Sequence, residues 1–92
     1  MHTPNLCNLA SQSLHLMQNH APMSHCSPSR TAMLTGRSVG TTHIWDLASY
    51  FRNVTGNFTT IPQFFRNKGY RTTAIGKIFH EGSASGESKY KE

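Results

Sequence analysis

Three of the four prolines in this sequence divide it into short helical segments, because proline fits the first turn of a helix but not its interior. The first follows an N-cap threonine and predicts a helix over residues 4–19, whose apolar residues recur at helical spacing and should bury one face. The second predicts a helix over 27–35 that Gly36 ends. The third lies in the capping-box pattern Thr60-Ile-Pro-Gln63 and predicts a short helix that ends at Gly69.

The segments between these helices predict a loop and a strand. Residues 37–58 have no clear period and should form a long ordered loop. Residues 70–75 favour a strand by their composition, and Gly76 would end it. Residues 77–80 would then lie at the carboxyl end of that strand, where open α/β sheets usually bind ligands. The predicted fold class is therefore α/β.

The size and charge of the chain narrow the classes of protein that it can belong to. A chain of 92 residues forms at most one small domain, and one this short has a thin margin of stability. Its formal net charge of +5 favours an anionic partner without choosing between nucleic acid, a polyanionic sugar and a sulfate ester. No apolar run reaches the length of a membrane span, and no signal peptide is evident. Both ends are interpreted as cuts through a larger protein.

The most informative segment is Cys26-Ser-Pro-Ser-Arg30, at the start of the second predicted helix. A helix N-terminus carries about half a unit of positive charge, which favours a bound anion. Arg30, one turn later on nearly the same face, adds a full charge with a bidentate donor. The segment indicates an oxyanion site with a sulfur atom at its mouth, although Cys-x-x-x-Arg alone fits a buried structural cysteine better.

The longer string, in which Leu34-Thr-Gly-Arg37 follows Cys26–Arg30, resembles the signature of the sulfatase family. The resemblance covers nearly the whole chain, and its further matches are Thr3-Pro-Asn-Leu6, Leu9-Ala10, Ile61-Pro62, Gly69-Tyr70, Thr73, Gly76-Lys77 and His80. It implies an alkaline-phosphatase-like fold, a mixed sheet flanked by helices, of which residues 1–92 would be a part of the N-terminal catalytic domain. Cys7 departs from the family, which usually has Asp there, and should weaken a local cap rather than catalysis.

The resemblance also assigns roles to four residues. Cys26 would be converted after translation to formylglycine by the formylglycine-generating enzyme, and the hydrated aldehyde would be the nucleophile. Arg30 would hold the formylglycine oxygens, and Lys77 would contact the sulfate. His80 would be the base or hydrogen-bond partner, since imidazole titrates near working pH. Cys26 and Lys77 should therefore lie close together around one anion.

The family also binds one divalent cation, usually calcium, which prefers carboxylate and other oxygen ligands. The chain has only four acids, and none of them is close to Cys26 in sequence: Asp46, Glu81, Glu87 and Glu92. Cys26, as formylglycine, is the one ligand expected from this chain, and the other ligands would lie outside it. The chain by itself should therefore be inactive.

Several further patterns in the sequence bear on the function. Asn53-Val-Thr and Asn57-Phe-Thr are candidate glycosylation sites, which agree with the lysosomal or secretory setting that the resemblance suggests. A zinc cluster of His15, His20, His25 and Cys26 is disfavoured, because spacings of five fit neither a helical pair nor a Cys-x-x-Cys motif. A disulfide between Cys7 and Cys26 is disfavoured too, because it would remove the nucleophile. The aromatic residues from Trp45 to Phe65 could line a sugar site, but they are expected instead to pack the loop onto the body of the domain.

The leading functional hypothesis is a sulfuric ester hydrolase that acts on a sulfated uronic acid of a glycosaminoglycan. His80 follows Lys77 by three residues, and this spacing resembles that in the members of the family that act on this substrate. The alternatives within the class are a sulfatase for another ester and a hydrolase of phosphate or phosphonate monoesters. A basic module that binds polyanions and a truncated, non-catalytic product also remain open. No nucleic-acid-binding motif is present, and the positive residues are scattered, so a nucleic acid partner is not expected.

Overall fold

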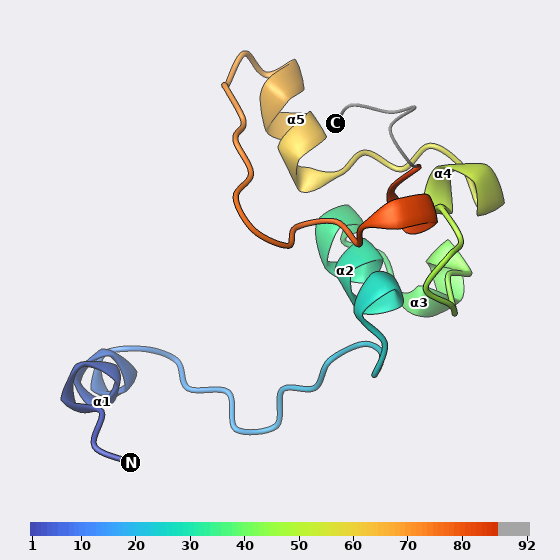
Figure 1. Ribbon diagram of the computed structural model, residues 1–92. Coiled ribbons are helices and arrows are strands. Elements are labelled where there is room, and N and C mark those ends of the chain that lie inside the picture. The colour runs from blue at the N-terminus through green and yellow to red at the C-terminus, as the bar shows by residue number, and fades with distance from the viewer. Residues whose placement is uncertain (87–92) are drawn as a thin grey trace.

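The computed structural model describes residues 1–86. They form the helices α1 (Pro4–Ser11), α2 (Cys26–Thr35), α3 (Val39–Thr42), α4 (Phe51–Val54) and α5 (Ile61–Asn67), followed by the 3-10 turn η1 (Gly82–Ser85). Figure 1 shows α2, α3, α4, α5 and η1 gathered together, whereas α1 lies apart at the end of an extended segment. No helix in this part of the chain combines the length and the apolar character that crossing a membrane requires.

Helix α1 begins at the predicted proline but ends at Ser11, so the prediction of a helix over 4–19 is wrong in length. None of its residues is buried, and the apolar face that was expected to be covered, including Leu6 and Leu9, is exposed. Short helices are marginal in water unless an amphipathic face packs against another element. Without such packing the helix stops after two turns, where the Ser11 hydroxyl donates to the Asn8 carbonyl at 2.7 Å.

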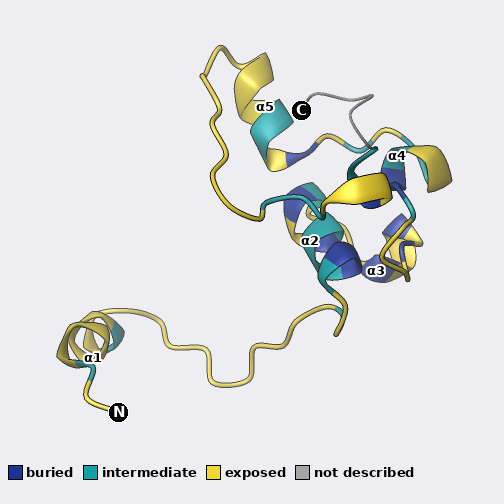
Figure 2. Cartoon of the chain, viewed as in Figure 1, coloured by how far each residue is buried: buried dark blue, intermediate teal, exposed yellow. Residues whose placement is uncertain are grey.

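Helix α2 confirms the prediction for 27–35, with a start one residue earlier at Cys26. Gly36 ends it in the left-handed conformation, at a φ of 65°, which glycine adopts without steric cost. Its buried residues are Ser27, Pro28, Ala32 and Leu34. Figure 2 shows the buried residues concentrated in α2, α3 and α4, which makes α2 part of the packed centre of the molecule.

Residues 37–58 were predicted to be a loop, yet they contain α3 and α4 and most of the core. Ile44, Tyr50 and Phe51 form the buried cluster, and the half-buried Phe58 packs against it. The rings of Tyr50 and Phe51 meet edge to face with centroids 5.2 Å apart. The prediction failed because each helix is a single turn, too short to show a period of 3.6.

Helix α5 confirms the capping box: Thr60 Oγ1 accepts the Gln63 N–H at 3.4 Å, and Gln63 Oε1 accepts the Thr60 N–H at 3.4 Å. The strand predicted at 70–75 is wrong, since these residues form an exposed coil. A strand needs a neighbour to satisfy its N–H and C=O groups, and no other strand exists within residues 1–86. The sheet of the predicted α/β class is therefore not present in the described part of the chain.

Candidate active site

Cys26 is the first residue of α2, a helix of ten residues, and follows the extended residue His25. The first helical turn closes where the Ser29 N–H donates to the His25 carbonyl at 3.2 Å. The next two residues, Ser27 and Pro28, are buried, whereas Cys26 is half-buried and its thiol is free. The helix thus places a reachable sulfur at its positive end while its neighbours anchor the turn.

Lys77 lies beside this sulfur although it is 51 positions further along the chain. Its Nζ donates to Cys26 Sγ over 3.8 Å. The expectation that these two side chains meet is confirmed. The Lys77 side chain is exposed and Cys26 is half-buried, so both residues remain accessible to solvent.

Arg30, one turn after Cys26, reaches the same segment by a different route. Its Nη1 donates to the main-chain carbonyls of Lys77 and Ile78, the second at 3.1 Å. Its Nε is buried and has no hydrogen-bond partner among residues 1–86. The Arg30 guanidinium therefore links α2 to residues 77–78, and its Nε remains a buried donor without a hydrogen-bond partner in the described part of the chain.

The carbonyls of Lys77 and Ile78 are part of this arrangement, and the sequence did not indicate them. Side-chain chemistry carries the signals that a motif search reads, whereas a main-chain acceptor exists at every residue. Only the path of the chain from residue 70 to residue 80 decides which carbonyls face Arg30.

His80 completes the set of predicted residues. Its half-buried ring places Nδ1 2.8 Å from the Glu81 carbonyl oxygen. A carbonyl only accepts, so Nδ1 carries the proton and Nε2 is the acceptor nitrogen of the neutral ring. Within the described residues the ring is bonded to this neighbouring carbonyl rather than to Cys26. The arrangement orients a proton acceptor close in sequence to Lys77.

The described acidic residues do not form a metal centre near Cys26. Asp46 Oδ1 accepts the N–H groups of Ala48 at 2.7 Å and Ser49 at 2.6 Å, and Oδ2 accepts the Ser49 hydroxyl at 2.6 Å. These bonds, led by the one from the Ser49 hydroxyl, lower the pKa of Asp46 below its ordinary value. No group of three or more His, Cys, Asp or Glu side chains within residues 1–86 is placed to hold a metal ion. Glu87 and Glu92 lie outside the described residues, and those that are described do not fit a calcium site.

Arg52 was not predicted to matter, yet it joins α4 to the start of α5. Its Nη1 donates to Asn57 Oδ1 and to the Phe58 carbonyl at 3.2 Å, and its Nη2 donates to Gln63 Oε1 at 3.0 Å. Its guanidinium also lies 4.8 Å from the centroid of the Phe51 ring. A lone Arg between unpatterned residues gave no sequence signal, and its partners are brought together only by the fold.

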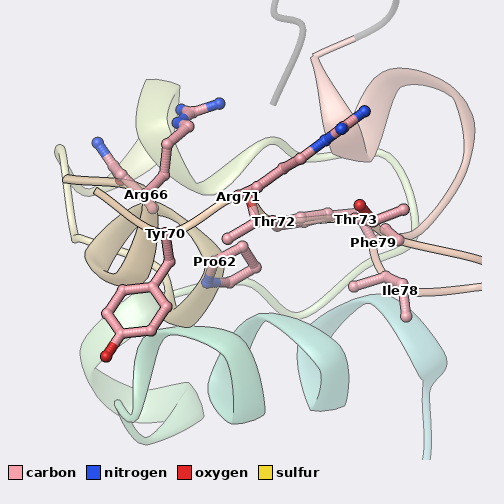
Figure 3. Close-up of a pocket in the computed structure, with 10 residues that line it drawn as sticks. Pro62, Arg66, Tyr70, Arg71, Thr72, Thr73, Ile78 and Phe79 are labelled. Carbon is pink, nitrogen blue, oxygen red and sulfur yellow. The ribbon is translucent and has the colours of Figure 1, made fainter. Parts of the chain in front are cut away.

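A hollow of about 490 Å³ opens between α5 and residues 70–79. Figure 3 shows that its lining comes from the helix on one side and from the coil on the other. The lining residues are Pro62, Gln63, Arg66, Tyr70, Arg71, Thr72, Thr73, Ala74, Ile78 and Phe79. Ile78 and Phe79 border the hollow, whereas none of the four predicted site residues does. The hollow is therefore separate from the Cys26 site.

The two glycosylation sequons differ in their surroundings. Asn53 is exposed on α4, and the hydroxyl of its sequon residue Thr55 donates to the Thr42 carbonyl at 2.5 Å. Asn57 is exposed in coil and accepts the bond from Arg52 through Oδ1. The aromatic residues also divide: Tyr50 and Phe51 are core, as packing predicted, while Trp45, Phe64 and Phe65 are exposed.

The start of α2 thus brings together the Cys26 sulfur, the Lys77 ammonium and, one turn later, the Arg30 guanidinium. Comparison with known proteins shows the family to which the chain belongs. A model of the sulfatase family matches residues 1–91, so the chain belongs to the sulfatase family. Members of this family hydrolyse sulfate esters, generally with the help of a divalent metal ion.

Individual relatives share much of the sequence. Iduronate 2-sulfatase of Mus musculus is 45% identical over 86 residues, which cover 94% of this chain and 16% of that protein. Iduronate 2-sulfatase of Homo sapiens is 47% identical over 83 residues, 90% of this chain and 15% of that protein. Arylsulfatase G of Mus musculus is 40% identical over 86 residues, 88% of this chain and 16% of that protein. The chain thus spans about a sixth of the length of these relatives.

Proposed function

We propose that this chain is part of a sulfuric ester hydrolase whose nucleophile is formylglycine made from Cys26. The observation that carries the proposal is the position of Lys77 Nζ, 3.8 Å from Cys26 Sγ at the start of α2. Both the helix N-terminus and the ammonium attract an anion to one point, and that point holds the residue expected to react.

The chemistry explains why such a point is useful. A sulfate monoester is an anion, and its hydrolysis is slow unless the sulfuryl oxygens meet preorganised positive charge. One hydroxyl of a hydrated aldehyde at position 26 would attack sulfur while the ester S–O bond breaks, so that the alcohol leaves with a proton. Loss of a proton from the second hydroxyl would then reform the carbonyl and expel sulfate. A thiol lacks that second hydroxyl and would stay sulfated, which is why the proposal requires the modification.

The other three residues take roles that their surroundings support. Lys77 binds a sulfuryl oxygen, since its ammonium is exposed beside position 26. Arg30 donates to the formylglycine oxygens, for which its buried and unpartnered Nε is the available donor. His80 exchanges a proton through Nε2, because Nδ1 is held by the Glu81 carbonyl.

The divalent cation is proposed to be calcium, with most of its ligands outside this chain. The described residues do not fit a metal site, and only the oxygens of formylglycine at position 26 would contribute a ligand. Residues 1–92 are proposed to be one part of an N-terminal catalytic domain with an alkaline-phosphatase-like fold, whose mixed sheet comes from other segments.

A sulfated uronic acid of a glycosaminoglycan is the proposed substrate. Identities of 45% and 47% with two iduronate 2-sulfatases support it. The 40% identity with arylsulfatase G supports a sulfatase for another ester as the alternative. The proposed setting is the lysosome or the secretory pathway, where the two sequons would be used and where Cys26 would meet the formylglycine-generating enzyme.

The direct test is to incubate the purified chain with formylglycine-generating enzyme and to label aldehydes with a hydrazide. Mass spectrometry should find the aldehyde at position 26 and an unchanged thiol at Cys7, which is the internal control. A free thiol that persists at Cys26 while a known substrate peptide is converted would overturn the proposal.

A further inference from the structure

We infer that Arg30 is a positioning residue that holds Lys77 over Cys26, an inference that rests on the proposed role of Lys77 in binding sulfate. The coil that leads to Lys77 gives the reason for needing such a residue. Residues 70–77 are exposed and belong to no helix or strand, and Gly76 has a φ of 81°. Nothing in that coil fixes where the ammonium lies.

The Arg30 guanidinium supplies the missing constraint from α2. A single nitrogen, Nη1, donates to two successive main-chain carbonyls, those of Lys77 and Ile78. Hydrogen bonds from a charged donor are stronger than neutral ones. Because two neighbouring acceptors are held at once, the orientation of the Lys77 backbone is restricted together with its position.

The spacing along α2 converts this constraint into catalytic geometry. Arg30 follows Cys26 by four residues, which is about 6 Å along a helix axis and on nearly the same face. The carbonyl of Lys77 is therefore held by a residue one helical turn after Cys26, and the Lys77 side chain places Nζ at Sγ. A flexible lysine loses less entropy on binding an anion when its backbone is already held.

This role differs from general support of the fold. The core cluster consists of Ile44, Tyr50 and Phe51, and α2 is anchored by residues such as the buried Leu34. Arg30 is only half-buried, and its hydrogen bonds within residues 1–86 go to the carbonyls of residues 77 and 78. Removal of the guanidinium should therefore release Lys77 before it affects α2.

The test measures the proximity of Lys77 to Cys26 on the unconverted thiol. The full chain carries Cys7→Ser so that Cys26 is the single thiol, and it is treated with N-succinimidyl iodoacetate, which joins an amine to a nearby thiol through a very short spacer. Cleavage after Asp46 and Glu81 then separates the Cys26 peptide from the Lys77 peptide, and mass spectrometry gives the yield of the cross-link. Arg30→Ala is compared with Arg37→Ala, which removes a guanidinium from just beyond the same helix.

Arg30→Ala should lower the yield by about tenfold or more, the size of the loss of a charge-assisted hydrogen bond, and Arg37→Ala should leave it unchanged. Leu34→Ala serves as a second variant, because it destabilises α2 without touching the tether. If Arg30→Ala and Leu34→Ala lose cross-linking in the same proportion to lost helical circular dichroism, the role is structural and the inference is wrong. An unchanged yield in Arg30→Ala overturns it too. Since the thiol form is used, these outcomes are independent of the aldehyde assay for the proposed function.

Discussion

Lys77 Nζ and Cys26 Sγ lie 3.8 Å apart, and the two residues reach this distance from segments of different character. Cys26 belongs to a helix anchored in the packed centre, whereas Lys77 ends an exposed coil. The sulfur is thus held by a helix, and the ammonium that is proposed to bind sulfate approaches it from coil. Electrostatic stabilisation of this kind is effective when the charges are in place before the reaction begins.

Two isoleucine variants, one in the core and one on the surface, are predicted to differ in their effect on the free energy of unfolding. Ile44 is fully buried in the core cluster, while Ile75 is 89% exposed in the coil. Ile44→Val should lower the free energy of unfolding by about 0.5–1.5 kcal/mol, because one buried methylene is lost. Ile75→Val should change it by less than about 0.5 kcal/mol, as expected for an exposed position. Urea unfolding followed by circular dichroism measures both, and equal effects would place the core elsewhere.

Two threonine variants at the start of α5, one that removes the cap and one that does not, are also predicted to differ in their effect on the free energy of unfolding. Thr60 is buried and its hydroxyl accepts the Gln63 N–H, whereas its neighbour Thr59 is exposed. Thr60→Ala should cost about 1 kcal/mol of unfolding free energy through loss of the cap, and Thr59→Ala should cost little. The readout is again the urea midpoint. A larger loss in Thr59→Ala than in Thr60→Ala would argue against the capping geometry.

An element of the structure could be predicted from the sequence where neighbouring residues alone determine it. The cap at Thr60, the stop at Gly36 and the start of α2 near Cys26 are each set by neighbouring residues, and all three were predicted. The length of α1 and the strand at 70–75 depend on partners elsewhere, which the described residues do not provide, and both were predicted wrongly.

The contacts of the candidate site also fall into those that the sequence could predict and those that it could not. Cys26 and Lys77 could be paired in advance because the resemblance implied one anion between them, and their proximity is confirmed. The hydrogen bonds from Arg30 to the carbonyls of residues 77 and 78 could not be predicted, because every residue has a main-chain carbonyl and the side-chain pattern does not mark which ones are used. The roles of Arg30, Lys77 and His80 in turnover stay predictions.

The turn at Asp46 predicts a pH dependence of stability. Hydrogen bonds from the Ser49 hydroxyl, the Ser49 N–H and the Ala48 N–H hold the pKa of Asp46 below its ordinary value of 3.8. A native pKa below the unfolded one means that the stabilisation is fully present above 3.8 and is lost as the pH falls through the lowered native value. The urea midpoint should therefore decline at acidic pH. Asp46→Asn should flatten this part of the profile, and Glu81→Gln should retain it.

The two sequons are predicted to differ in whether they are glycosylated in the folded chain. Asn53 lies in α4, where its backbone is helical and the Thr55 hydroxyl is engaged by Thr42, whereas Asn57 lies in exposed coil. A chain that is glycosylated after folding should carry its glycan at Asn57. Asn57→Gln should abolish the mass lost on treatment with peptide N-glycosidase, and Asn53→Gln should not. The reverse pattern would show that glycosylation precedes formation of α4.

The last prediction is that the 92-residue chain, even after conversion of Cys26, neither hydrolyses sulfate esters nor binds calcium tightly. Loss of one preorganised electrostatic contact typically costs about 10²–10³ in rate, and absence of a whole metal site should cost more. The described residues supply Lys77 beside Cys26 and Arg30 one turn after it, but no cluster of carboxylates, and Asp46 is engaged in its own turn.

The measurements are hydrolysis of an aryl sulfate and of a sulfated uronate, each with and without calcium, together with calorimetric titration of calcium. A longer polypeptide that contains residues 1–92 and the rest of a sulfatase domain is the positive control, and the same polypeptide with Cys26→Ala is the negative one. Only the converted longer polypeptide should show turnover that depends on calcium. Calcium-dependent turnover by the isolated chain would mean that it assembles a metal site from its own residues, and the assignment of the ligands to other segments would then be wrong.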